Sequence, residues 1–178
     1  MAYTNINQYN PLVNANSVVL ISMVSQQFDT NLLTSSVIKL AEITHIEKPL
    51  SREFYEELVI QYNTASLTAA NSTLYDDYLE RVLCWFVKLE AMNEIHNNVT
   101  SSGVMTNIDD YSTKVSPAEF ALMKNDVERK ANLFLQDMLD FLNDSVVINN
   151  YPTYKKYGVG SSIINDDSTN KKGGVIFY

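Results

Sequence analysis

The stretch from Leu74 to Val99 constrains the fold of this chain most strongly. Its apolar stripe recurs at steps of three and four residues, which predicts an α-helix with one buried face. At 1.5 Å per residue such a helix is about 39 Å long. The stripe consists of Leu74, Tyr78, Val82, Trp85, Leu89, Met92, Ile95 or His96, and Val99.

The same helix is apolar over more than one face near its middle. Leu83, Cys84, Trp85 and Phe86 are consecutive, and a helix that is apolar nearly all round is packed on more than one side. We therefore expect this segment to lie where several helices, or two subunits, meet.

A second long helix begins at a strong start signal. Ser116, Pro117 and Glu119 occupy the N-cap, first and third positions of a helix, the pattern of a capping box. A stripe from Phe120 to Leu142 follows, and Asn143 ends it. Two long helices joined by one loop pack antiparallel, so the sequence predicts a mainly α fold, a helical bundle.

The rest of the chain divides around this pair. Residues 1–30 are Asn-rich and read as an N-terminal arm, residues 31–145 as the helical domain, and residues 146–178 as an extended C-terminal docking tail. Within the domain, helices are expected at 31–46 and from Ser51 onward. Short β segments are possible in the arm and in the tail; for the β-branched run 18–24 the pattern leaves strand and helix open.

Residues 99–115 form a predicted loop that is longer than the usual helix–helix connection of ~2–8 residues. Loops of this length are functional or are ordered by a partner. Its candidate channel or partner residues are Gly103, Val104, Asp109 and Asp110.

Composition excludes several classes of function. The formal net charge is −8, which argues against sequence-reading DNA binding because phosphates require Lys and Arg. The single cysteine, Cys84, cannot form an intramolecular disulfide, and we interpret it as a buried structural thiol. No basic leader region is present, and the apolar run 18–24 is too short to span a bilayer, so we expect neither a signal peptide nor a membrane helix.

We expect no enzyme activity and no cofactor. The two histidines, His45 and His96, lie far apart without neighbouring ligands, so no metal site is predicted. No phosphate-binding, dinucleotide-binding or nucleophile-elbow motif occurs.

The C-terminal tail carries the clearest interaction signals. Tyr151, Tyr154 and Tyr157 with Lys155 and Lys156 favour a tyrosine-rich interface over a base-stacking cluster. The chain finishes with Val175, Ile176, Phe177 and Tyr178 after a polar linker. We expect this apolar tip to dock in a groove or to extend a sheet edge.

The order of these segments resembles the head–tail connector (adaptor) proteins of tailed bacteriophages, especially crAss-like phages that infect Bacteroides. The resemblance covers roughly residues 30–155. The residues that carry it are Pro49-Leu50-Ser51, Phe54-Tyr55-Glu56-Glu57-Leu58, Ser102-Gly103-Val104, Ser116-Pro117-Ala118-Glu119-Phe120, Phe141-Leu142 and Tyr151-Pro152.

The resemblance implies a structural virion protein that is assembled in the bacterial host cytoplasm. Such proteins form a homo-oligomeric ring, usually a dodecamer, beneath the portal protein; the ring extends the DNA channel and gives neck and tail proteins a platform. DNA passes through without specific binding, which suits an acidic body, and no membrane is involved.

The resemblance also implies which residues form the binding sites. The tail would grip the portal through Tyr151, Tyr154, Tyr157, Val175, Ile176, Phe177 and Tyr178, and the subunit interface would include Leu83, Trp85 and Phe86. Two other classes stay open: a helical regulator or scaffold outside the virion, and a helical bundle that binds a small ligand.

Overall fold

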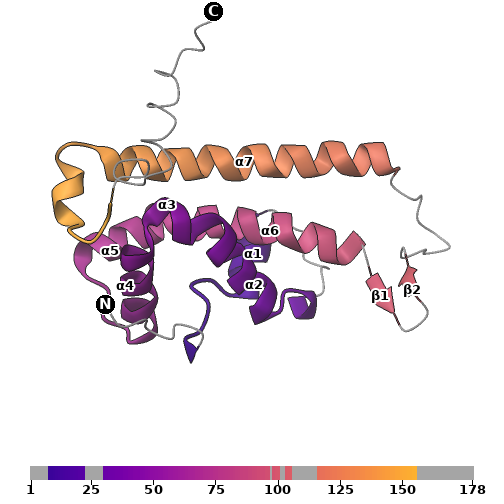
Figure 1. Cartoon of the computed structure of the whole chain (residues 1–178), viewed down its shortest axis with the longest axis horizontal. Coiled ribbons are helices and arrows are strands. Elements are labelled where there is room, and N and C mark those ends of the chain that lie inside the picture. Colours follow the sequence, from indigo (N-terminus) through magenta and orange to yellow (C-terminus); the bar gives the residue numbers. More distant parts are fainter. Residues whose placement is uncertain (1–7, 23–29, 97, 101–102, 106–115, 156–178) are drawn as a thin grey trace, which may run out of the picture.

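The computed structural model describes residues 8–22, 30–96, 98–100, 103–105 and 116–155. These residues are mainly helical (Figure 1), which confirms the predicted fold class. The α-helices are α1 (Ala15–Ile21), α2 (Ser35–Glu42), α3 (Lys48–Leu50), α4 (Arg52–Asn63), α5 (Ala69–Leu74), α6 (Glu80–His96) and α7 (Pro117–Asn143). The described residues also form two 3-10 turns, η2 (Thr30–Leu32) and η5 (Val147–Asn150), and two π-helical turns, η3 (Ile43–Glu47) and η4 (Tyr75–Leu79). The two strands are β1 (Asn98–Thr100) and β2 (Gly103–Met105).

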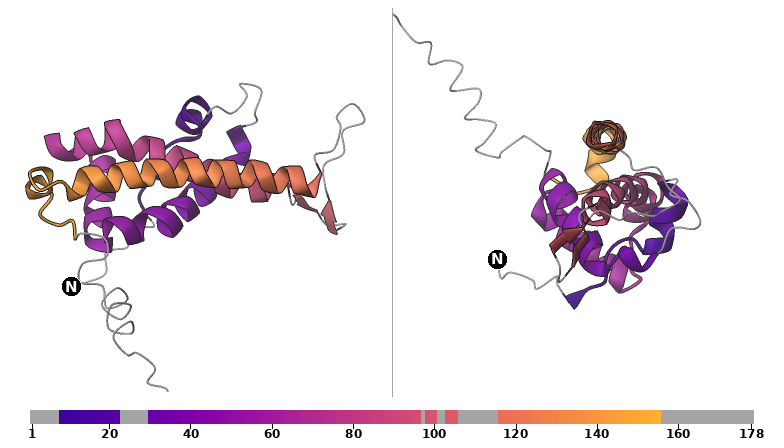
Figure 2. Two further views of the ribbon diagram at one scale, coloured as in Figure 1. Left: turned by 90° about the horizontal axis from the view of Figure 1, so that it is seen from above. Right: turned by 90° about the vertical axis from the view of Figure 1, so that its right-hand side faces the viewer.

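Helix α6 lies at the centre of the molecule. The antiparallel α7 runs along one side of it, and α1 and α2 pack on the other side (Figures 1 and 2). Six successive side chains of α6, residues 82–87, are buried, as a helix enclosed from two sides requires. The other helices, α4 among them, supply the rest of one core, whose largest fully buried side chains include Phe54, Tyr55, Met138 and Leu142.

The two π-helical turns join shorter helices into longer ones. Backbone angles remain α-helical from α5 through η4 into α6, so the predicted long helix starts earlier, at Ala69. The helix that begins with α2 likewise continues through η3 into α3, past Pro49. The sequence predicts that the helix ends before this proline. The helix continues through Pro49, which has no N–H to donate, because the wider turn η3 comes directly before it.

The N-terminal segment belongs to the core, which corrects the prediction of an arm over residues 1–30. Leu12, Val13 and Val18 are buried. The run that begins at Val18 is helical in its described part: α1 starts after Asn14, whose side chain accepts a hydrogen bond from the Ser17 N–H, and burial outweighs the weak helix preference of valine. Residues 1–7 and 23–29 lie outside the described part.

Two further local predictions are corrected. The predicted loop 99–115 contains an antiparallel hairpin in which Val99 pairs with Val104 and Thr100 with Gly103. The sequence allows a short strand at residues 146–150, but Val147–Asn150 form the 3-10 turn η5, because the Asp144 carboxylate caps the N–H groups of Val146 and Val147. Asp109 and Asp110 lie outside the described residues.

The start of α7 is confirmed in detail. The Glu119 N–H donates to Ser116 Oγ at 3.2 Å, and the Ser116 N–H donates to Glu119 Oε2 at 2.9 Å. Both halves of the predicted capping box are therefore formed.

Glu42 fixes the N-terminal segment to the helical body. Its fully buried carboxylate accepts hydrogen bonds from the Leu12 N–H at 2.5 Å and the Tyr55 hydroxyl at 2.9 Å, and Lys39 Nζ lies 3.7 Å away. The Tyr75 hydroxyl donates to the Leu12 carbonyl at 2.7 Å. Burial raises the pKa of Glu42 above its usual 4.5, against the hydrogen bond from Leu12 and the charge of Lys39, which lower it.

This raised pKa predicts a pH-dependent stability. A carboxyl group whose folded-state pKa is raised contributes most below pH 4.5, and the contribution is lost as the pH rises through the folded-state pKa. Glu42→Gln should therefore gain stability relative to wild type in urea denaturation as the pH rises above 4.5, whereas Glu128→Gln, at an exposed site, should not. Glu42→Ala should lower the free energy of unfolding by about 3 kcal/mol, because two buried donors lose their acceptor. If the stabilities of Glu42→Gln and wild type changed with pH in parallel, the raised pKa of Glu42 would be contradicted.

Ser51, between α3 and α4, has a strained backbone. Its φ is 67° and its ψ is 143°, a region that glycine occupies readily and serine does not. Its buried hydroxyl has no hydrogen-bond partner among the described residues.

We predict that Ser51→Gly raises the free energy of unfolding by about 1–2 kcal/mol, because it removes this strain. Chemical denaturation measures the change. The same replacement at Ser36, an exposed position in α2, should instead lower stability by about 0.5 kcal/mol. A loss of stability in both variants would show that Ser51 is not strained.

Candidate interaction surfaces

The base of the C-terminal tail packs on the helical body. Tyr151 and Tyr154 are only 3 % and 6 % exposed. Both rings meet Phe54 of α4 edge-on, with centroids 5.7 and 5.9 Å apart, and Tyr151 also meets Phe141 of α7 at 6.2 Å. The prediction that these two tyrosines grip a portal is therefore corrected: they are committed within the chain, because their rings complete the core between α4 and α7.

Hydrogen bonds fix the same segment, which we call the tail anchor (residues 151–155). The Tyr151 hydroxyl donates to the Ala70 carbonyl at 2.8 Å, and burial raises the pKa of this hydroxyl. The Thr153 hydroxyl donates to Glu57 Oε2 at 2.5 Å. An exposed ion pair between Lys155 and Glu53, 2.9 Å long, adds little.

Glu57 also belongs to a partly buried polar network that the sequence did not reveal. The side-chain amide of Asn71, a residue only 3 % exposed, donates to Glu57 Oε1 and Gln61 Oε1 at 3.2 and 2.8 Å. Glu57 and Thr153 are 96 residues apart in the chain, so no local pattern connects them. The network holds α4, α5 and the tail anchor together. The remaining predicted tail residues, Tyr157 and Val175 to Tyr178, lie outside the described residues.

The predicted subunit interface is part of the core. Leu83, Trp85 and Phe86 are at most 8 % exposed, because α6 is covered on both sides by helices of its own chain. Phe86 stacks on His45 at 4.1 Å. The placement of these residues at a subunit interface is thus corrected.

Trp85 sits in a group of aromatic and basic side chains between α6 and α7. Its ring lies 5.9 Å from Phe134, with Lys88 Nζ at 5.0 Å and Lys130 Nζ at 5.4 Å. Burial, followed by the nearby Lys130, lowers the pKa of Lys88; Lys88 Nζ donates to the Ser22 carbonyl at 2.8 Å. These contacts connect α7, α6 and the end of α1 rather than leaving the indole for a partner.

The outward side of α7 carries exposed apolar residues: the sequence analysis did not single out Leu122 and Leu133, and it wrongly placed Met123 in the buried stripe of this helix. Leu122 is 69 %, Leu133 59 % and Met123 54 % exposed. Leu122 and Leu133 are 11 residues apart, about three helical turns, so both point away from α6. We call these three residues the α7 surface.

Exposed apolar residues also occur on the N-terminal helices and turns, whose helices α1 and α2 pack on α6. Leu20 of α1, Leu32 of η2, Leu40 of α2 and Ile43 of η3 are 45–75 % exposed. Leu40 and Ile43 are three residues apart and share one helix face. We call these four residues the α1–α2 surface.

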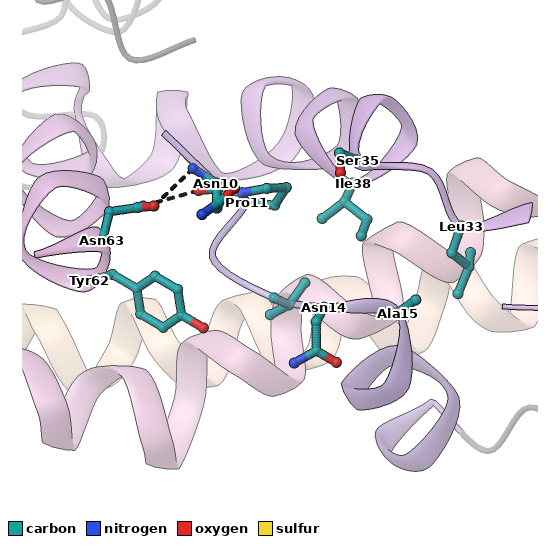
Figure 3. A pocket seen from close by; sticks show the side chains of 10 residues that line it. Asn10, Pro11, Asn14, Ala15, Leu33, Ser35, Ile38, Tyr62 and Asn63 are labelled. Atoms are coloured by element: carbon teal, nitrogen blue, oxygen red, sulfur yellow. Dashed lines mark hydrogen bonds between the residues drawn. The ribbon is translucent and has the colours of Figure 1, made fainter. Parts of the chain in front are cut away.

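An open cavity of about 600 Å³ lies where the N-terminal segment crosses α4 and α2 (Figure 3). Asn63 accepts from the Asn10 N–H at 2.8 Å and donates to the Asn10 carbonyl at 3.0 Å. Its ten lining residues include no charged side chain. The cavity therefore lacks the carboxylate or histidine that acid–base chemistry commonly uses.

Among the described residues, no cluster of three or more His, Cys, Asp or Glu side chains is suited to hold a metal ion. Burial raises the pKa of the Cys84 thiol to about 12, which leaves it protonated and unreactive at neutral pH. No described helix has the length and apolar content to cross a membrane.

Comparison with known proteins identifies one family. A model of a family of unknown function, DUF6712, matches residues 46–162, about two thirds of the chain. The match begins in η3 and includes α4 to α7 and the tail anchor. No curated protein and no solved structure matches the chain.

The tail anchor predicts a graded response to substitution at Tyr151. Tyr151→Ala should lower the free energy of unfolding by about 3–5 kcal/mol because it leaves a cavity beside Phe54, and Tyr151→Phe by only about 1 kcal/mol because it removes one hydrogen bond. Denaturant titration measures both changes, with the exposed neighbour Asn150→Ala as control. Equal losses for the Ala and Phe variants would show that the ring does not contribute packing.

Proposed function

The chain belongs to DUF6712, a family of unknown function, and we propose that it is a head–tail connector subunit of a tailed bacteriophage. In this proposal, copies assemble into a ring, a dodecamer in the family that the sequence resembles. The ring attaches to the portal protein, extends the DNA channel, and gives neck and tail proteins a platform in the virion.

The observation that carries the proposal is the α7 surface. Leu122 and Leu133 are more than half exposed on a 27-residue helix whose opposite face is packed on α6. Exposed apolar residues aligned along one helix face mark a site of association. A structural subunit has such a face, and the described residues hold no candidate metal site beside it.

Charge and the tail anchor support the same proposal. The net charge of −8 per chain suits a channel wall past which DNA slides, because acidic side chains repel phosphates. The tail anchor is held on the helical body by Tyr151, Thr153 and Tyr154, and residues 156–178, 23 in number, follow it in the sequence. Fully extended they reach at most about 80 Å, far enough to contact a neighbouring ring such as the portal.

We predict that the purified chain forms rings in electron microscopy and that it co-purifies with the portal protein from the same genome. The double substitution Leu122→Glu and Leu133→Glu should abolish rings, because it places carboxylates in an apolar contact, and should leave the circular dichroism spectrum unchanged. Val146→Glu, an equally exposed apolar site on neither surface, is the matched control and should still assemble.

A chain that neither assembles nor binds the portal protein would contradict the proposal. That result would favour the regulator or scaffold class, in which the helical body acts outside the virion.

A further inference from the structure

We propose that the α7 surface of one copy docks on the α1–α2 surface of the next copy, so that subunits join head to tail. This inference rests on the proposed ring and assigns the two surfaces that form it. These two surfaces take the place of the subunit interface that the sequence predicted around Trp85, because the Trp85 region is buried within each chain.

The position of the two surfaces favours a head-to-tail contact. One belongs to α7 and the other to the N-terminal helices, and these elements pack on α6 from different sides (Figures 1 and 2). A two-fold dimer through either surface alone leaves the other exposed in each copy. A head-to-tail contact covers both, and when it closes it produces a ring.

The distribution of charge also distinguishes the possible pairings. Helix α7 carries five exposed acids against one exposed and two partly exposed bases, and Asp126 is paired with two of these bases; the acids are Glu119, Asp126, Glu128, Asp137 and Asp140, and the bases are Lys124, Arg129 and Lys130. Two α7 helices face to face would bring acid against acid, a like-charge contact that disfavours that pairing.

The α1–α2 surface avoids this repulsion. Among the described residues between 8 and 47 the acidic side chains are Glu42, which is fully buried, and Glu47, which is partly buried and lies 3.8 Å from Arg52. The exposed positions around Leu40 are Ser35, Ser36 and Thr44. An acidic helix with leucines on its face thus meets an apolar surface that carries no fully exposed acid among the described residues, and the occupant of each surface is a second copy of this chain.

The test introduces Leu133→Cys on the α7 surface and Leu40→Cys on the α1–α2 surface of the full chain. A short bismaleimide then links the two cysteine thiols where the surfaces of neighbouring copies meet. Wild type, whose Cys84 is buried with a raised thiol pKa, should give no cross-linked product. The double variant should give a ladder of covalent multimers, an equal mixture of the two single variants should give dimers only, and either single variant by itself should give monomers.

A complementary measurement uses Leu133→Asp and Leu40→Asp. Each variant should be monomeric by mass photometry, and an equal mixture should form dimers, because each dimer joins the intact α7 surface of one variant to the intact α1–α2 surface of the other. A two-fold contact gives no such complementation.

The outcomes separate this inference from the proposed function. Rings in which a single cysteine variant cross-links to itself, or in which the double variant gives no ladder, overturn the head-to-tail assignment and leave the connector proposal standing. A chain that forms no ring with or without the portal protein overturns both.

Discussion

The architecture depends on the burial of α6 from two sides. Every side chain from Val82 to Val87 is buried, so no single partner helix can satisfy this segment. Helix α7 covers one side and the N-terminal helices cover the other. The order of layers follows from this requirement, and the outer sides of the two covering layers become the surfaces that remain available for association.

Polar contacts between distant parts of the chain fix how the covering layers lie. Glu42 holds the N-terminal segment through Leu12, and Glu57 holds the tail anchor through Thr153. In both places a glutamate receives hydrogen bonds from a segment that is not helical, and leaving those donors unpaired would be costly. The apolar core thus determines which helices pack together, and these two carboxylates determine where the connecting segments lie.

The parts of the fold that local signals specify were predictable. The stripe around Trp85 and the capping box at Ser116 identified the long helices, because periodicity and capping act within a few residues. The N-terminal segment was misread because its order comes from Glu42 and Tyr75, 30 and 63 residues from Leu12. The pattern around Trp85 showed burial on two sides, but periodicity alone does not say whether the cover is the same chain or a second copy.

The extent of the family match bears on the second covering layer. The match begins at Ile46 and therefore excludes α1 and α2, although it includes α6. Without those two helices the residues of α6 that face them would be exposed to water, at a cost that rises with the apolar area uncovered. A family member that lacks an equivalent of α1 and α2 must therefore cover this side of α6 in another way, with its own additional segment or with a neighbouring subunit. In this chain α1 and α2 cover it, and in the head-to-tail arrangement their outer side then receives the α7 surface of the next copy.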